Sequence, residues 1–483
     1  MAIGKATQKY EIMELAFDGP STGNPFRDVW LRARCTHGER QVLIDGFYDG
    51  EGIYRLRLMP DAEGEWTLVT ESNAPEMDGH RHSFVCTPAR ARVHGPVRVH
   101  DTHHFRFADG TAYYPAGTTC YAWIHQPEEL QERTLETLRS TPFNKLRMTV
   151  FPKDYIYNRN EPTLYPFART GEGEHDYTRP NPAFYRLLER RIRQLAGLGI
   201  EADLILFHPY DRWGYAQMSH DDDLHYLRYI VARLAAHRNV WWSVANEYDF
   251  ILGHKLMSHW DAFFQTIQER DPYGHLRSIH NGDLTANYDH TRPWVTHVCI
   301  QNPHVHECKT WRARYGKPVI DDECEYEGNI PLPWGNISPQ ELVHRFWVLA
   351  ANGCYGGHGE TYLDPEEELW WSKGGVLRGE SCPRIALLRD TLEGLPGGLT
   401  PLDDEWVWGR VAGGASGDHR LLYFGPHQPV AWSFGLPQDV DYQVEWIDTW
   451  NMTVTSVRHT FHNAEAIPLP GRPWMAVRIR PVR

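Results

Sequence analysis

The chain has 483 residues, with 49 Lys and Arg against 63 Asp and Glu, and a formal net charge of -14 at pH 7. Nucleic acids and anionic membranes bind concentrated basic surfaces, so this balance disfavours both as partners and favours a neutral small substrate. The length exceeds what one core holds, and we expect two or three domains, one of them large enough for a barrel of about 250 residues.

The start of the chain, residues 1–10, contains no apolar stretch of the kind found in signal peptides, and no segment approaches the roughly 18 apolar residues of a membrane span. The eight cysteines are scattered without a Cys-x-x-Cys pair. This spacing indicates neither a disulfide framework nor a zinc ribbon. We therefore expect a protein with reduced thiols in the cytoplasm.

Residues 1–92 read as short alternating strands separated by turns, for example at residues 45–50 and 60–66, and predict an N-terminal β-sandwich. After Gly95 the rhythm changes, because apolar runs begin to alternate with amphipathic stretches such as 184–198. That alternation is typical of repeated strand and helix units. Residues 93–397 are therefore predicted to form a (β/α)8 TIM barrel within an α/β fold class.

Eight strands are expected in that barrel, and eight is the number that closes it. They are placed near residues 112–120, 144–151, 201–207, 239–245, 276–280, 295–300, 317–322 and 353–358. The last helix is expected at 383–392, followed by a Gly- and Pro-rich linker at 394–398. The remainder, residues 398–483, returns to short strands and predicts a C-terminal β-sandwich domain.

The run 239–247 (NVWWSVANE) is an apolar strand that ends abruptly in Asn246 and Glu247. The C-terminal ends of barrel strands open onto the face where barrel enzymes keep their active sites. Glu247 is therefore the leading candidate for an acid that transfers a proton. The structural alternative is an interdomain strand whose terminal Glu pairs with an Arg.

A second acid, Glu323, ends the predicted seventh strand in the run 317–328. Two carboxylates that face one cleft suggest glycoside hydrolysis, in which one acid protonates the leaving oxygen while the other attacks the sugar carbon or activates water. Glu325 and Glu327 lie on the same side of an extended chain as Glu323. The sequence leaves open which of the three faces the cleft.

Other side chains at strand ends are candidates for binding a substrate. Arg147 stands in an otherwise apolar strand and needs a negative partner if it is buried, either a nucleophilic carboxylate or a structural acid at the barrel rim. The aromatic content, 13% of the chain with 19 Trp and 24 Tyr, suits stacking on sugar rings or, equally, strand pairing in two β domains. The remaining candidates for a carbohydrate site are His208, Asp211, Trp213, His280, Gln301, His358, Trp123 and Trp370.

Metal and cofactor chemistry receive little support from the motifs. His304, His306 and Cys308 share one loop, but a His-x-His pair without clear third and fourth ligands is more often surface loop than zinc site. A His-Glu-x-x-His helix, a Gly-rich phosphate loop and a Gly-x-Ser-x-Gly elbow are all missing from the sequence. We expect no cofactor and no catalytic metal.

The sequence resembles the retaining glycoside hydrolases of clan A, whose acid/base follows an Asn at the end of the fourth strand and whose nucleophilic Glu ends the seventh. Asn246-Glu247 and Glu323 match those positions. The chain is most similar to apiosidase-like bacterial proteins that join an N-terminal sandwich of unknown function, here with residues 23–26 and 46–50, to this barrel and a small C-terminal domain. The resemblance implies that Arg147 supports the nucleophile and that Asn246 binds the hydroxyl next to the anomeric carbon.

These observations predict a glycosidase that retains configuration and acts on chain ends of oligosaccharides or on small glycosides. The alternatives are a carbohydrate-binding protein without catalysis and a metal-dependent hydrolase that uses the His304 loop. Sugar, linkage, anomer, ring size and oligomeric state, including a homo-oligomer, are left open by the sequence.

Overall fold

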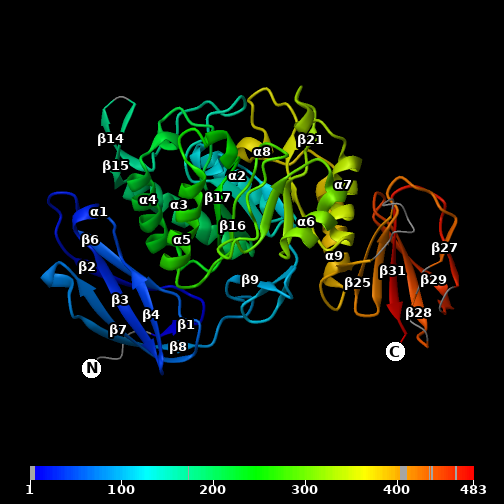
Figure 1. Cartoon of the computed structure of the whole chain (residues 1–483), viewed down its shortest axis with the longest axis horizontal. Helices are drawn as coiled ribbons and strands as arrows, with labels where there is room; N and C mark the ends of the chain where they lie inside the picture. Colours follow the sequence, from blue (N-terminus) through cyan, green and yellow to red (C-terminus); the bar gives the residue numbers. More distant parts are fainter. Residues whose placement is uncertain are drawn as a thin grey trace.

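The computed structural model describes residues 6–171, 173–402, 411–433, 436, 439–462 and 465–482. Three parts follow one another along the long axis of the molecule, in chain order (Figure 1). An N-terminal β domain lies at one end, a barrel with surrounding helices occupies the middle, and a C-terminal β domain lies at the other end. No helix in these residues is long and apolar enough to cross a membrane.

The N-terminal domain consists of a five-stranded sheet, in the order β1-β8-β7-β3-β4, and a three-stranded sheet, β2-β6-β5. Burial alternates along the strands, as in β2, so each sheet turns one face inward. Leu31, Leu56 and Trp66 are among the side chains of the shared core, which confirms the predicted sandwich. The strands are β1 Thr7–Gln8, β2 Met13–Asp18, β3 Leu31–His37, β4 Arg40–Asp45, β5 Phe47–Tyr48, β6 Ile53–Leu58, β7 Gly64–Ser72 and β8 Arg81–Thr87, with α1 Pro25–Asp28.

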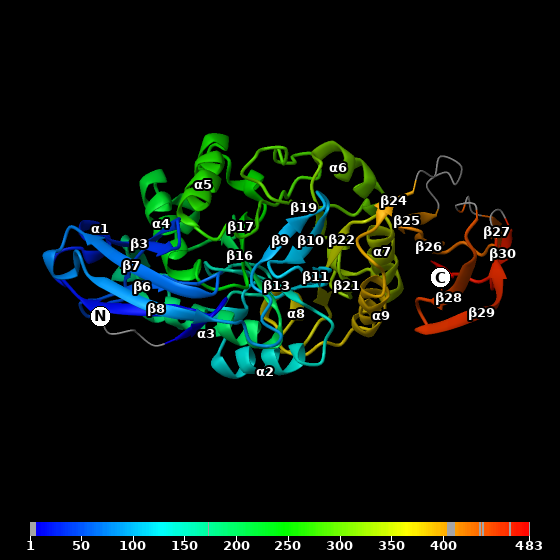
Figure 2. The same cartoon turned by 90° about the horizontal axis from the view of Figure 1, so that it is seen from below.

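A small antiparallel sheet connects this domain to the barrel; it lies below the barrel in Figure 1 and in front of the barrel in Figure 2. Its strands are β9 Val97–His100, β10 His104–Phe107 and β11 Ala112–Tyr113. Phe105 of β10 packs its ring 5.5 Å from Trp241 and 5.6 Å from Tyr355, which belong to barrel strands. The sheet therefore covers the end of the barrel opposite the face where the strands finish.

The eight predicted barrel strands are confirmed, and they form one parallel sheet in the order β18-β17-β16-β13-β12-β22-β20-β19. The barrel is nearly closed, because Thr296 N, just before β19, donates to Arg277 O of β18 at 2.9 Å. The predicted first strand, 112–120, is split by Pro115 into β11 and β12. The strands are β12 Gly117–Thr119, β13 Lys145–Thr149, β16 Glu201–Phe207, β17 Val240–Ala245, β18 Arg277–Ser278, β19 Val298–Gln301, β20 Val319–Glu323 and β22 Tyr355–His358.

Helices follow most of these strands. Between β18 and β19, however, residues 279–297 are all described and contain no helix, since the stretch is rich in Asn, Asp and Thr and contains a Pro. The barrel therefore departs from eight full repeats at this place. Its helices are α2 Glu128–Leu138, α3 Pro182–Leu198, α4 His220–Leu234, α5 Met257–Arg270, α6 Cys308–Tyr315, α7 Pro339–Ala351, α8 Trp370–Lys373 and α9 Ser381–Glu393, and short strands in its loops are β14 Phe167–Gly171, β15 Glu174–Pro180, β21 Glu327–Gly328 and β23 Glu360–Thr361.

The C-terminal domain contains a six-stranded antiparallel sheet, in the order β24-β25-β26-β31-β28-β29, and a two-stranded sheet of β27 and β30. It packs against helix α7 of the barrel, where the rings of Trp347 and Tyr423 lie 5.6 Å apart. A Cβ atom on Gly414 would lie 2.5 Å from Ala351 O, so the close approach requires glycine. The strands are β24 Thr400–Pro401, β25 Ala412–Ser416, β26 His419–Tyr423, β27 Ala431–Ser433, β28 Tyr442–Asp448, β29 Thr453–Phe461, β30 Ala466–Pro468 and β31 Met475–Pro481.

Buried ion pairs join the N-terminal domain to the barrel. Glu189 of α3 accepts from Arg57 NH1 at 2.6 Å and also contacts Arg233 of α4, while Arg233 NH2 lies 2.8 Å from Asp49 Oδ1. Burial alone would raise the pKa of Glu189, but the two guanidinium groups outweigh it and lower that pKa to about 2. The carboxylate is therefore the anion that keeps two arginines paired at the domain boundary.

We predict that Glu189→Ala destabilises the protein by about 3–5 kcal/mol, because it leaves two buried guanidinium groups without their shared partner. Glu136→Ala is the matched control: Glu136 pairs with Arg139 at 3.3 Å, but both side chains are more than half exposed, and an exposed pair contributes at most about 1 kcal/mol. Chemical unfolding at pH 7 measures both. The folded pKa of Glu189 lies below its ordinary value of 4.5, so its contribution should be lost as pH falls from about 4.5 toward 2.

Candidate active site

A cavity of about 260 Å³ opens where the barrel strands end. Asn246 and Glu247 follow β17, Gln301 ends β19, and Glu323 ends β20. This is the face on which barrel enzymes carry their active sites. The lining residues are Lys153, Tyr155, Tyr210, Asn246, Glu247, Leu284, Gln301, Pro303, Glu323, Glu325, Tyr326, Pro333, Trp334 and Trp371.

Glu247 has a left-handed backbone, with φ 51° and ψ 50°, immediately after the last residue of its strand. Such a conformation costs a residue with a Cβ atom roughly 1–3 kcal/mol and is concentrated at functional sites. Its carboxylate accepts a hydrogen bond from Asn246 Nδ2 at 3.1 Å and one from the Tyr210 hydroxyl. The sharp turn therefore ends the strand and leaves the acid buried but facing the cavity.

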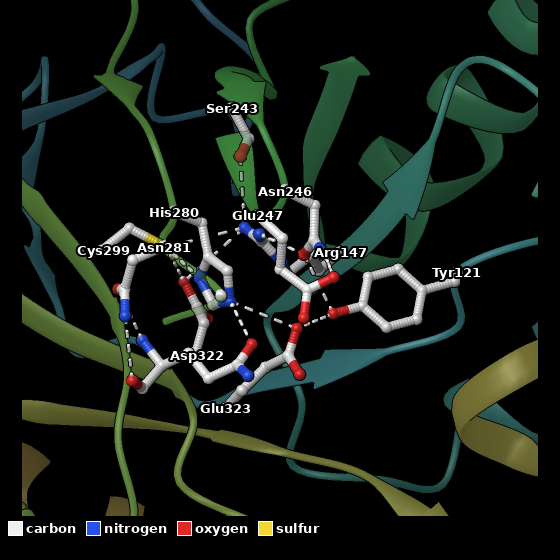
Figure 3. A network of polar contacts seen from close by, with 12 residues as sticks. Tyr121, Arg147, Ser243, Asn246, Glu247, His280, Asn281, Cys299, Asp322 and Glu323 are labelled. Carbon is white, nitrogen blue, oxygen red and sulfur yellow. Dashed lines mark hydrogen bonds and ion pairs between the residues drawn. The ribbon is translucent and has the colours of Figure 1, made fainter. Parts of the chain in front are cut away.

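Glu323 faces the same cavity from the end of β20. The Tyr121 hydroxyl donates to its Oε1, and His280 Nε2 lies 3.2 Å from the same oxygen. Figure 3 shows these contacts converging on Glu323 from Tyr121 and His280 on different strands and loops. Glu323 is thus held by donors that favour its ionised form.

Gln301 connects the two acids. With its amide nitrogen directed at them, that nitrogen lies 3.2 Å from Glu323 Oε2 and 3.3 Å from Glu247 Oε1. Because one nitrogen contacts both acids, Glu323 Oε2 and Glu247 Oε1 are separated by at most the sum of the distances from Gln301 to each of them. Asn281 holds Gln301 in place, because Asn281 Nδ2 donates to Gln301 O and Gln301 N donates to Asn281 Oδ1, both at 3.2 Å.

The surroundings push the pKa values of the two acids in opposite directions. Burial and then the negative charge of Glu323 raise the pKa of Glu247. Burial would also raise the pKa of Glu323, but the hydrogen bond and charge of His280, together with Lys153, lower it. One carboxyl group is thereby suited to hold a proton while its neighbour stays ionised.

Beneath the cavity, charged side chains fill the barrel interior. Lys145 Nζ lies 2.9 Å from Asp203 Oδ2 and 2.6 Å from Asp322 Oδ1. Arg147 donates to Ser243 Oγ at 3.2 Å and to Asn246 Oδ1 at 3.0 Å (Figure 3). Arg147 reaches Glu323 indirectly, through the Tyr121 hydroxyl that contacts both Asn246 Oδ1 and Glu323.

Lys153 occupies an aromatic cage on the wall of the cavity. Its ammonium lies 3.7 Å from the ring centre of Tyr121, 4.4 Å from that of Tyr210 and 5.0 Å from that of Trp371. Burial lowers its pKa to about 8, against the opposing effect of Glu247 and Glu323. Below that pH Lys153 is a cation that favours the ionised form of both acids.

The rival acids have other partners. Glu325 lines the cavity, but its Oε2 forms an ion pair with Arg345 NH2 at 2.7 Å. Glu327 is fully buried and accepts hydrogen bonds from Ser381 and Tyr362. Of the three acids, Glu323 is the one that shares Gln301 with Glu247.

The other predicted binding residues divide into two groups. Asn246, Gln301, Arg147 and His280 lie in the cavity or touch the residues that line it. The second group serves the surrounding structure and does not belong to the lining formed by the described residues. In it, His208 bonds to Phe151 O, Asp211 accepts from Trp213 N and Ala216 N, Trp213 bonds to Glu161, Trp123 to Gln131 O, Trp370 to Thr118, and His358 lies beside Thr118.

Several cavity residues were not among the candidates selected from the sequence, although the pair Trp370-Trp371 was expected to form a stacking wall over the cleft. Tyr210 and Trp371 lie next to residues that the sequence analysis selected, and Tyr326 lies between Glu325 and Glu327. An aromatic residue in a strand-end loop is a usable signal for them. Tyr121, directly after the predicted first strand, and Tyr155, just after the second, carry the same signal. Lys153 is not aromatic and Trp334 lies farther from its strand end, so only barrel closure shows that they reach the two acids.

The His304 loop does not form the metal site considered from the sequence. Within the described part of the chain, His304, His306 and Cys308 are not brought together as a ligand group. Cys308 is buried, and His306 lines a separate cavity beside the C-terminal domain.

Comparisons with known proteins identify the family of the chain. The family of apiosidase-like catalytic domains matches residues 99–364, more than half of the chain, and two domains of unknown function, DUF5060 and DUF5605, match residues 6–73 and 408–480. A candidate glycoside hydrolase from Bacteroides vulgatus ATCC 8482 is 40% identical, with a TM-score of 0.93 over 99% of this chain and 100% of that one. A family 5 glycoside hydrolase from the same organism shares the fold, at 15% identity and a TM-score of 0.61 over 80% of this chain and 93% of that one. No curated protein matches the sequence.

The barrel, its paired acids and these relatives define the class of the protein as a glycoside hydrolase, with a carbohydrate as substrate. Within that class, the chain belongs to the apiosidase-like family, with a DUF5060 domain before the catalytic barrel and a DUF5605 domain after it.

We predict that Lys153→Met shifts both limbs of the pH profile of kcat/KM to higher pH. Lys153 lowers the pKa of Glu247 and that of Glu323, so removing its charge raises both. Lys153→Arg keeps the charge and should leave the limbs in place. A profile for Lys153→Met that overlays the wild type, or limbs that move apart, would contradict this electrostatic coupling.

Proposed function

We propose that the protein is a retaining glycosidase that acts on chain ends of oligosaccharides or on small glycosides, with Glu247 as acid/base and Glu323 as nucleophile. One observation carries the proposal: two buried acids at the ends of β17 and β20 share Gln301, and their surroundings shift their pKa values in opposite directions.

The reaction follows from these protonation states. Glu323 attacks the anomeric carbon as a carboxylate, while Glu247 gives its proton to the glycosidic oxygen and the alcohol leaves. Glu247, now ionised, takes a proton from a water molecule as that water attacks the same carbon and releases Glu323. The raised pKa of Glu247 keeps this acid protonated for the first step. Glu323 loses its negative charge when it bonds to the sugar, which lowers the pKa of Glu247, so Glu247 is ionised and can accept a proton from water in the second step.

The spacing of the two acids is compatible with retention of configuration. Retaining enzymes hold their carboxyl groups about 5–5.5 Å apart, whereas inverting enzymes need about 6.5–9.5 Å to admit a water molecule. The contacts of Gln301 set an upper limit on the distance between Glu247 Oε1 and Glu323 Oε2. This limit includes the whole retaining range and just reaches the lower end of the inverting range.

Asn246 is suited to bind the hydroxyl next to the reacting carbon. Arg147 occupies its carbonyl oxygen, so the amide nitrogen points to Glu247 and the cavity. One hydrogen of that nitrogen goes to Glu247, and the second is available to the sugar. Arg147 supports Glu323 through Tyr121 in this scheme.

The shape of the cavity favours a short substrate. Tyr155, Trp334 and Trp371 form one wall, with the rings of Trp334 and Trp371 4.8 Å apart. Aromatic faces stack on the apolar faces of sugars. A volume of about 260 Å³ accommodates a terminal sugar better than the interior of a long polymer.

We predict that Glu247→Gln and Glu323→Gln respond differently to the leaving group. Glu247→Gln should lose about 10²–10⁴-fold in kcat/KM on alkyl glycosides, the usual contribution of general acid catalysis, and far less on dinitrophenyl glycosides, which leave without a proton. Glu323→Gln should lose activity on both. Initial rates over a panel of aryl pyranosides and furanosides first identify the sugar.

Glu325→Gln is the matched control, since it removes an acid of the same cavity that already pairs with Arg345. We expect its loss to be much smaller than that of Glu323→Gln. A larger loss in Glu325→Gln than in Glu323→Gln would mean that Glu325 is the nucleophile. Full activity of Glu247→Gln on alkyl glycosides would exclude Glu247 as the acid.

Retention makes a separate prediction. Proton NMR recorded before mutarotation should show that the first sugar released has the anomeric configuration of the substrate. An inverted product would mean that Glu323 activates water instead of attacking the sugar.

The cytoplasmic location and the oligomeric state stay predictions. The eight cysteines are all free and all but Cys382 are buried, in keeping with a reducing compartment.

A further inference from the structure

Glu327, His358 and Glu360 meet in a buried cluster outside the cavity. Glu327 begins β21 and Glu360 begins β23, and these two residues pair across the two parallel strands, while His358 ends β22. His358 Nε2 lies 3.8 Å from Glu327 Oε1 and 3.7 Å from Glu360 Oε1. All three ligand atoms lie within 4.8 Å of one another, and each residue is at most 2% exposed.

Two of these atoms face one another without a hydrogen bond. His358 Nε2 and Glu360 Oε1 are buried and have no hydrogen-bond partner among the described residues. Their separation of 3.7 Å is too long for a direct hydrogen bond. A buried polar atom without a hydrogen bond is destabilising, and more so when the group is charged, so a ligand between these two atoms would stabilise the site.

The other atoms of the cluster are held by neighbours. Thr118 Oγ1 lies 2.8 Å from His358 Nδ1 and thereby aims Nε2 at the two acids. Arg378 N donates to Glu360 Oε2 at 2.7 Å, and the Tyr362 hydroxyl donates to Glu327 Oε2 at 3.2 Å. Ser381 N and Ser381 Oγ also donate to Glu327 Oε1, the atom nearest His358, so both oxygens of this carboxylate are positioned. Hydrogen bonds from neighbouring groups orient metal-binding His and Glu side chains in this way.

Charge points to a cation. Glu327 and Glu360 bring two carboxylates into the interior, and in the described part of the chain neither forms an ion pair with Lys or Arg. The Arg378 guanidinium, whose backbone N–H contacts Glu360, pairs instead with Asp364. A protonated His358 would balance only one of the two negative charges, whereas a divalent cation balances both.

We propose that Glu327, His358 and Glu360 bind a divalent transition-metal ion, with Zn²⁺ as the probe. The donor set of one imidazole and two carboxylates suits such ions. Ligand atoms about 2.0–2.2 Å from zinc are separated by at most about 4.4 Å. The 3.7 and 3.8 Å from His358 to the two acids fall within that limit, and the carboxylate oxygens, which lie within 4.8 Å of each other, are close to it. The ion stabilises the wall of the cavity and takes no part in the hydrolysis.

The position of the cluster explains this structural role. Glu327 directly follows Tyr326, a lining residue of the cavity. Thr118, which orients His358, also accepts a hydrogen bond from Trp370 Nε1 at 2.8 Å, and Trp370 precedes Trp371 of the cavity wall. A Cβ atom on Gly379 would lie 2.3 Å from Glu327 Oε1, so the segment before α9 lies tightly over the site.

Metal analysis and calorimetry on the full-length protein test the proposal. The protein is treated with EDTA, dialysed, titrated with ZnCl₂ by calorimetry, and analysed for bound metal by mass spectrometry. We expect one Zn²⁺ per chain and a thermal midpoint that rises with Zn²⁺. Glu327→Gln and Glu360→Gln keep the shape of the side chain but remove its charge, and each should weaken binding about 100-fold or more.

Glu366→Gln is the control, because it removes the same charge from an exposed acid in the loop after β23. It should bind Zn²⁺ as the wild type does. Circular dichroism confirms that each variant is folded, and two independent ligand variants guard against the misfolding of one.

Two outcomes would overturn the proposal. Wild-type protein that takes up no Zn²⁺ would indicate a protonated His358 between two carboxylates. Zn²⁺ binding that persists unchanged in both Glu327→Gln and Glu360→Gln would place the ion on other histidines of the surface.

Discussion

Four buried charges in the barrel interior support the active site. Lys145 and Arg147 on β13 lie among Asp203 on β16 and Asp322 on β20, so three strands are joined by ion pairs in a medium where an unpaired charge is very costly. Because Arg147 also holds the carbonyl oxygen of Asn246, the same network turns the amide nitrogen toward Glu247. The position of the acid therefore depends on charge pairing one layer below it.

The surroundings of Glu247 and Glu323 give these two chemically identical side chains different pKa values. Glu247 is raised in pKa by burial and by its neighbour, while Glu323 receives contacts from His280 and Tyr121 that stabilise its charge. Lys153 acts on both, from a cage of aromatic rings that includes Trp371. Trp371 is also part of the wall that we propose for the sugar, so it links the electrostatics of the acids to the proposed stacking. The left-handed backbone of Glu247 shows that local conformational energy is spent to keep the acid in this place.

Most of the fold could be predicted because strand and helix periodicity are local properties. All eight barrel strands were found, including the short β18, and the flanking sheets follow from alternation and turn residues. The missing helix between β18 and β19 was not anticipated, since a count of repeats implies eight helices. In the site, Glu247 and Glu323 were identified because each ends an apolar strand. Trp213 and Trp370 were selected as aromatic residues in loops that follow strands, but their indole nitrogens bond to structural partners.

The sequence by itself determined the order of domains, the barrel and the two strand ends that carry the acids. Only the tertiary structure decided which acid of Glu323, Glu325 and Glu327 faces Glu247, because their spacing places all three on one side of an extended chain. The backbone turns left-handed at Glu325, Arg345 pairs with its carboxylate, and Glu327 turns into the buried cluster with His358. Such outcomes depend on contacts between residues far apart in the chain, and closure of the barrel brings those residues together.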